Sequence, residues 1–165
     1  MIDLDTVSGD PLQLRSVYGC FPSGVTAVCA LSGGGPVGIV ASSFTSVSMT
    51  PALVSLCVQN TSTTWPRWRE LPRLGVSVLG EDQDSAAVRL AAKQRDRFAD
   101  LAWEVTPGGG LLVHGAVAWL ECSVHMEVPA GDHSVVLLQI HGVRARPDRA
   151  PLVFHGSRFR QLMAV

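Results

Sequence analysis

Two clusters of hydroxyl side chains, each following an apolar β-type run, are the residues best suited to ligand chemistry in this chain. The first is Ser42-Ser43-Phe44-Thr45-Ser46, between the runs 37–41 and 53–58, and the second spans 60–64. Because both lie at the ends of consecutive strands, we expect them to converge. Hydroxyl groups beside the free amides of a helix start bind anions. The pattern suggests a site for a polar-edged, phosphorylated ligand, although plain helix capping by Ser62 or Thr63 is the simpler interpretation of the second cluster.

Other chemistry in the sequence is sparse. The chain carries no glycine-rich dinucleotide motif, P-loop, nucleophile elbow or zinc-protease motif. Cys122 and His125 stand three apart on an expected strand, so they point to opposite faces and share no metal. His133 lies in a Gly-Asp-His turn, and the pattern alone favours an ordinary turn residue. We therefore expect no metal site and no catalytic nucleophile.

The elements that must position these residues are mostly strands. Glycine-rich turns separate short β-type runs, and the longest of these alternates apolar and polar residues over 116–128 with its apolar face running from Ala116 to Val128. The predicted strands are 25–31, 37–41, 53–58, 74–79, 116–128, 135–145 and 152–155. The sequence predicts a mainly β fold, a β-barrel or sandwich with peripheral helices, in a single domain over 1–165.

Three short helices are expected around this sheet. Asp10 and Pro11 cap and open the first, which ends at Gly19. The cluster 60–64 opens a second, through about residue 71, and Asp82 or Asp84 caps a third. The basic residues Lys93, Arg95 and Arg97 follow the third helix. They either bind phosphate or form a solvated helix end.

Composition limits the possible functions. The 165 residues are 47% hydrophobic and 16% charged, with a net charge of −1, which does not favour a nucleic-acid binder. Low surface charge predicts a homo-oligomer. The acidic N-terminus lacks a signal-peptide pattern, and no apolar run is long enough to span a membrane. Four scattered cysteines without a CxxC pair predict a reduced, cytoplasmic protein without structural zinc or disulfides.

A series of segments extends these observations to a known family. In order and spacing they resemble the flavin reductase-like family of FMN-binding split barrels, the small reductase components of two-component flavin monooxygenases. The resemblance covers about 17–162. The segments are FPSGVTAV at Phe21, VGIVASSFTSVSMTPALVSLCV at Val37, STTWP at Ser62, GVSVLGEDQ at Gly75, DRFA at Asp96, GAVAWLECSV at Gly115, AGDHSVVLLQI at Ala130 and PLVFHGSRF at Pro151.

The resemblance implies a Greek-key split β-barrel that forms a homodimer, with flavin near the dimer interface. It implies NAD(P)H-dependent reduction of FMN or FAD, with the reduced flavin passed to a partner monooxygenase. Hydride passes directly from nicotinamide to flavin, so the absence of catalytic motifs is expected. The alternatives are a flavoprotein that keeps FMN bound and acts on an organic substrate itself, and a non-catalytic flavin carrier or redox sensor.

The resemblance also assigns site residues. His133 lies beside the nicotinamide and positions it. Two family hydroxyls are replaced here, one by Val40 and one by Phe159, where the family usually has Thr and Tyr. The flavin-contact and nucleotide-contact positions are Val40, Ala41, Ser42, Ser43, Cys57, Val58, Asn60, Thr61, Ser62, Thr63, Lys93, Arg97, Phe154, Gly156 and Arg158.

Overall fold

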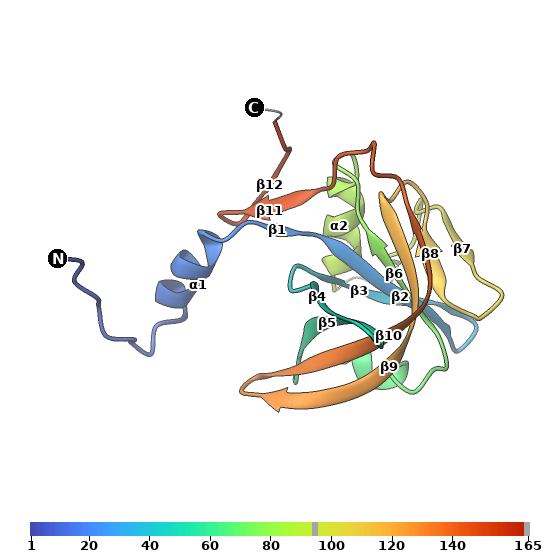
Figure 1. Ribbon diagram of the computed structural model, residues 1–165, viewed down its shortest axis with the longest axis horizontal. Coiled ribbons are helices and arrows are strands. Elements are labelled where there is room, and N and C mark those ends of the chain that lie inside the picture. The colour runs from blue at the N-terminus through green and yellow to red at the C-terminus, as the bar shows by residue number, and fades with distance from the viewer. Residues whose placement is uncertain (94–95, 164–165) are drawn as a thin grey trace.

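A curled antiparallel sheet of seven strands, in the order β3-β2-β6-β9-β10-β5-β4, forms the body of the computed structural model (Figure 1). The structure describes residues 1–93 and 96–163, so Arg95 lies outside the described residues. The strands of this sheet are β2 (Thr26–Ser32), β3 (Gly35–Ala41), β4 (Thr45–Met49), β5 (Ala52–Gln59), β6 (Leu74–Val78), β9 (Ala118–Ala130) and β10 (His133–Ala145).

Smaller elements complete the fold. A three-stranded sheet pairs β1 (Ser23–Gly24), β11 (Val153–His155) and β12 (Arg158–Arg160), and a separate ladder pairs β7 (Trp103–Val105) with β8 (Leu111–Val113). The helices are α1 (Pro11–Gly19), α2 (Asp84–Ala91) and the single 3-10 turn η1 (Trp65–Arg67). The prediction of a mainly β fold is confirmed. Within the described chain no ladder joins the two edge strands β3 and β4, so the large sheet curls without closing.

Glycines in the left-handed backbone region make the tight turns that set the strand register. Gly33 and Gly34 have φ of 62° and 82° and turn β2 into β3. Gly131, at φ 68°, turns β9 into β10. Non-glycine side chains rarely adopt these angles. The β9–β10 turn matters for the site because it brings His133 opposite Gln59 at the end of β5.

Two apolar clusters hold the sheet from its two faces. One fills the curl with Leu56, Trp68 and Leu138, all fully buried. The other packs α2 and β8 against the opposite face through Leu90 and Leu111. Together they fix the strand β3, which contributes Ile39 to the first cluster and Val40 to the second.

The helices differ from expectation in detail. The first has its predicted bounds, with the Asp10 Oδ1 accepting a hydrogen bond from Leu12 N at 2.9 Å. Neither Asp82 nor Asp84 caps α2, because Gln83 takes that position without a capping side chain and Asp84 is already helical. The second helix is only the turn η1, since burial of Trp65 and Trp68 directs the chain inward there.

The strand predicted over 116–128 is β9, but its apolar face is not buried throughout. Leu120 and Cys122 are buried, whereas Met126 and Val128 are exposed at 51% and 43%. A register shift interrupts the pairing with β10 in this region, and the outer half of the hairpin extends beyond the core (Figure 1). The apolar face of this strand is therefore buried only as far as about residue 124. No helix in the described ranges is long and apolar enough to cross a membrane.

Candidate functional site

An apolar hollow of about 480 Å³ lies between β3, α2 and the β11–β12 hairpin, and we call it the apolar hollow. Phe154 and Phe159 form one wall, edge to face with ring centroids 5.6 Å apart. Ser42 supplies the one side-chain hydroxyl. Apolar walls with few polar groups are typical of sites for flat ring ligands. The lining residues are Val25, Val40, Ser42, Ala87, Val88, Ala91, Ala92, Phe154 and Phe159.

Two residues of the first hydroxyl cluster, Ser42 and Ser43, have different roles at this hollow. Ser42 lines the hollow, whereas the Ser43 Oγ accepts a hydrogen bond from the Cys57 amide at 2.8 Å. Strand β4 pairs with β5 only as far as Ser55, so Ser43 satisfies a β5 amide just beyond that ladder. Ser43 therefore holds the turn that presents Ser42.

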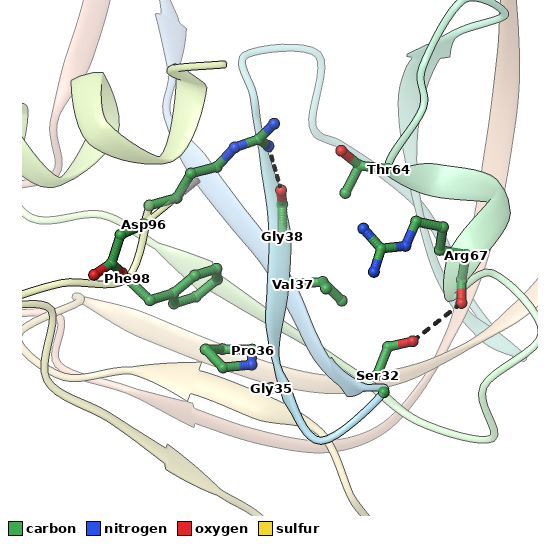
Figure 2. Close-up of a pocket in the computed structure, with 11 residues that line it drawn as sticks. Ser32, Gly35, Pro36, Val37, Gly38, Thr64, Arg67, Asp96 and Phe98 are labelled. Carbon is green, nitrogen blue, oxygen red and sulfur yellow. Dashed lines mark hydrogen bonds between the residues drawn. The ribbon is translucent and has the colours of Figure 1, made fainter. Parts of the chain in front are cut away.

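A second hollow, of about 430 Å³, lies between the β2–β3 hairpin and η1, and we call it the arginine hollow (Figure 2). Arg97 reaches it from beyond α2 and donates from Nη1 to the Gly38 carbonyl at 3.2 Å. Arg67 and Thr64 line the other side, and Figure 2 shows both across strand β3 from Asp96 and Phe98. Guanidinium groups and a hydroxyl are the donors that phosphate accepts best.

Gly38 explains how the chain packs at the arginine hollow. A Cβ at this position would lie 2.7 Å from the Cys29 Sγ and 3.1 Å from the Phe98 ring. Glycine therefore lets the segment after α2 approach β3 closely, and this approach brings Arg97 to the strand.

Strand β3 connects the two hollows. It is an edge strand, with Gly38 at the arginine hollow and Val40 at the apolar hollow. A strand rises about 3.3 Å per residue, so about 13 Å separates Gly38 from Ser42. One elongated ligand lying along this edge would reach an apolar pocket at one end and two guanidinium groups at the other.

The second hydroxyl cluster serves mainly to fix a turn. Asn60 Nδ2 donates to the Gly131 carbonyl at 3.0 Å, and the Ser62 Oγ accepts from Trp65 N at 3.1 Å. These bonds join the end of β5 to the β9–β10 turn and to η1. Val58, Asn60 and Ser62 line a third, smaller hollow of about 140 Å³. The N-cap residue of η1 is Thr64, without a side-chain capping bond, so neither Ser62 nor Thr63 is the N-cap; the Ser62 Oγ instead bonds the first amide of η1.

His133 begins β10 at the hairpin tip. Its Nδ1 lies 2.7 Å from the Asp132 Oδ1, and this hydrogen bond, together with the charge of the histidine, lowers the pKa of the Asp132 carboxyl. Within one chain His133 lines neither the apolar nor the arginine hollow. In Figure 1 the hairpin tip also lies well away from α2.

The cysteines fall into two classes. Burial raises the pKa of the Cys29 and Cys122 thiols to about 12, with the Glu121 charge contributing at Cys122. Cys20 and Cys57 are exposed. Over the residues that the structure describes, no three His, Cys, Asp or Glu side chains gather as metal ligands.

The structure therefore distributes the predicted site residues over several places. Val40, Ser42 and Phe154 line the apolar hollow, Arg97 the arginine hollow, and Val58, Asn60 and Ser62 the third. The remaining predicted positions line none of the three: Ala41, Ser43, Cys57, Thr61, Thr63, Lys93, His133, Gly156 and Arg158.

Sequence reasoning missed other lining residues. Thr64 belongs to the second hydroxyl cluster and was within reach of that argument. The spacing of the alanines in α2 is typical of a helix that packs on the core, so it does not indicate a ligand site. Arg67 carries no pattern signal, because its position depends on the length of η1.

Comparisons with known proteins point in one direction. The family model described as "Flavin reductase like domain" matches residues 18–163. The chain is 40% identical over 157 residues to an NADH-dependent FAD reductase of Streptomyces globisporus, covering 92% of this chain and 86% of that protein. It is 31% identical over 150 residues to the reductase subunit HsaB of a flavin-dependent monooxygenase of Rhodococcus jostii, covering 91% and 77%.

A solved structure agrees with the sequence comparisons. The Streptomyces globisporus C-1027 NADH:FAD oxidoreductase in complex with NAD and FAD fragments superposes with a TM-score of 0.90 at 39% identity. The match covers 97% of this chain and 98% of that one. The likeness therefore extends over the whole fold, including the strands that form the three hollows.

Proposed function

The chain belongs to the flavin reductase-like family, and from this premise we propose that it is an NAD(P)H-dependent flavin reductase. It transfers hydride from a nicotinamide nucleotide to FMN or FAD and supplies reduced flavin to a partner monooxygenase. This partner role is supported by the name of the Rhodococcus relative, which describes that protein as the reductase subunit of a flavin-dependent monooxygenase. The observation that carries the proposal is the pair of hollows along β3, one apolar and one lined by guanidinium groups.

The residues present fit a flavin. The apolar hollow has the Phe154 and Phe159 rings and the small alanines of α2 for a planar ring system, with the Ser42 hydroxyl at its edge. Arg97, Arg67 and Thr64 fit a phosphate. The space along β3 between Ser42 and Gly38 then suits the ribityl chain. Riboflavin, FMN and FAD share the ring system, and riboflavin lacks the phosphate. The arginine hollow would therefore contact the part of the ligand by which riboflavin differs from FMN and FAD.

The protein's contribution to the reaction is positional. The nicotinamide and the flavin supply the hydride chemistry themselves when bound, so no protein nucleophile or metal is needed. Val40 and Phe154 exclude water from one side of the ring. Ser42, held in place through Ser43, orients the polar edge. Arg97 and Thr64 hold the phosphate, and fixing the ring in this way brings the reacting atoms within productive distance.

We also propose that the working form is a homodimer. None of the α1 side chains is buried, and the helix lies apart from the curled sheet (Figure 1). Met49 on β4 and Met126 on the hairpin are exposed at 93% and 51%. A second copy that covers these surfaces would remove them from water. Exposed apolar residues of α1 and the turn after it are Leu12, Val17, Tyr18 and Phe21.

His133 takes its proposed role in that assembly. The hairpin that carries it does not reach the apolar hollow of its own chain, so we propose that it positions the nicotinamide of a site completed by the second copy. His133→Ala then raises KM for NADH more than it lowers kcat, while flavin affinity stays the same. Unchanged kcat and KM would contradict this role. We propose a cytoplasmic location, where NADH is available.

The test of the proposed function is steady-state oxidation of NADH with FMN, FAD or riboflavin as the acceptor. We expect rapid turnover with a flavin that exchanges freely. A purified yellow protein that oxidises NADH only when an organic substrate is added would support the bound-flavin enzyme instead. Tight flavin without any NADH oxidation would support a carrier or redox sensor.

A further inference from the structure

The arginine hollow contains a second guanidinium group, that of Arg67, which neither the sequence patterns nor the family resemblance assigns. We propose that Arg67 binds the phosphate of the flavin together with Arg97 and Thr64, and that it makes the enzyme discriminate phosphorylated flavins from riboflavin. This inference rests on the proposed function and identifies the flavin phosphate as the group that the site recognises. Figure 2 shows Arg67 reaching into the hollow from η1, across strand β3 from Asp96 and Phe98.

The backbone of Arg67 is firmly held. Its carbonyl oxygen accepts a hydrogen bond from the Ser32 Oγ at 3.2 Å, which ties η1 to the β2–β3 hairpin. Its flanking residues Trp65 and Trp68 are buried against each other, with ring centroids 5.0 Å apart. Because the backbone is already held here, ligand binding needs to order only the side chain of Arg67. The guanidinium is therefore presented to the hollow from a rigid base.

The charge of Arg67 is available for a ligand. Its neighbours Arg69 and Arg73 form ion pairs with Glu127 and Glu121, whereas no ion pair among the described residues includes Arg67. The acid in the hollow's lining is Asp96, whose carboxylate is directed away from the Arg67 guanidinium in Figure 2. The hollow thus keeps a net positive lining that favours an anion.

The side chains that line the arginine hollow are suited to bind phosphate. Two guanidinium groups from opposite walls match the several acceptor oxygens of a phosphate ester, and a hydroxyl adds a neutral donor. A hydrogen bond to a charged group contributes enough that losing one weakens binding by about tenfold. The volume of about 430 Å³ lies within the range of ligand sites and admits the phosphate with part of the attached chain.

The test compares Arg67→Gln with Arg67→Lys and with Arg149→Gln. Arg149 is the matched control, because it pairs with Asp82 outside all three hollows. Dissociation constants for FMN, FAD and riboflavin are measured from flavin fluorescence, and KM for NADH is measured separately. We expect R67Q to weaken FMN and FAD binding about tenfold and to leave riboflavin within about twofold. R67K recovers part of the loss, and R149Q binds like the wild type.

Three results would overturn the inference. If R67Q weakened riboflavin binding as much as FMN binding, Arg67 would maintain the shape of the hollow and would not bind the phosphate. No weakening for any flavin would mean that it makes no contact. An effect on KM for NADH alone would assign Arg67 to the nicotinamide nucleotide. A wild-type protein that binds FMN but oxidises no NADH would contradict the proposed function. The flavin dissociation constants of the Arg67 variants would still show whether Arg67 binds the phosphate.

Discussion

Replacing Ser43 with alanine tests whether its hydroxyl acts on the fold or on the ligand. In the structure the Ser43 Oγ accepts from the Cys57 amide at 2.8 Å and lies 3.5 Å from the Cys57 carbonyl. The strong contact is one neutral hydrogen bond at a half-exposed site, so its loss lowers the free energy of unfolding by about 1 kcal/mol. For a domain of this size that corresponds to a fall in melting temperature of about 2–4 °C.

Ser42→Ala is the matched control for this prediction. Ser42 lines the apolar hollow and makes no side-chain hydrogen bond in the described structure, so its substitution shifts the unfolding free energy by about 0.5 kcal/mol or less. Thermal and urea unfolding of both variants without flavin give the comparison. If Ser43→Ala unfolds like the wild type but binds flavin more weakly, the hydroxyl contacts the ligand and the reasoning is refuted.

Three further predictions follow from burial and charge. Gly75→Ala places a Cβ against the backbone of β8, and we expect loss of folded protein by circular dichroism; a native spectrum and melting temperature would show that β8 moves aside. Iodoacetamide at pH 8 modifies the exposed Cys57 but not the buried Cys29, whose pKa is raised by burial; mass spectrometry checks both sites, and equal labelling would contradict the burial argument. His133→Ala raises the pKa of the Asp132 carboxyl toward its ordinary value in an NMR titration, and an unchanged titration would contradict their pairing. Because that pKa is lowered in the folded state, the stability from the pair is present above the carboxyl's ordinary pKa and disappears as the pH falls through the lowered one.

The strands were predictable because local patterns determine them. The runs around β2, β3 and β5 are apolar and bounded by glycine or proline, and the structure gives each within two residues of expectation. The face of β9 was not predictable in the same way. Alternation shows which residues share a face, but burial of that face ends where the hairpin extends past the core, and that depends on distant strands.

The site was predictable in its residue types and not in its arrangement. The hydroxyl turn and the basic segment after α2 were both singled out, and Ser42 and Arg97 do lie at hollows along β3. The bond from Ser43 to Cys57 joins residues on different elements, so no periodicity shows it. Arg67 was missed because its direction depends on where η1 stops, and the burial of two tryptophans determines that.

The most direct measurement of the central claim is anaerobic stopped-flow mixing of NADH with FMN in the presence and absence of the protein. The account predicts that NADH is oxidised and flavin reduced together, mole for mole, at a rate proportional to protein concentration. It also predicts that reduced flavin passes through a filter that retains the protein. No acceleration by the protein, or reduced flavin that stays wholly bound to it, would contradict the claim that this chain reduces flavin and releases it.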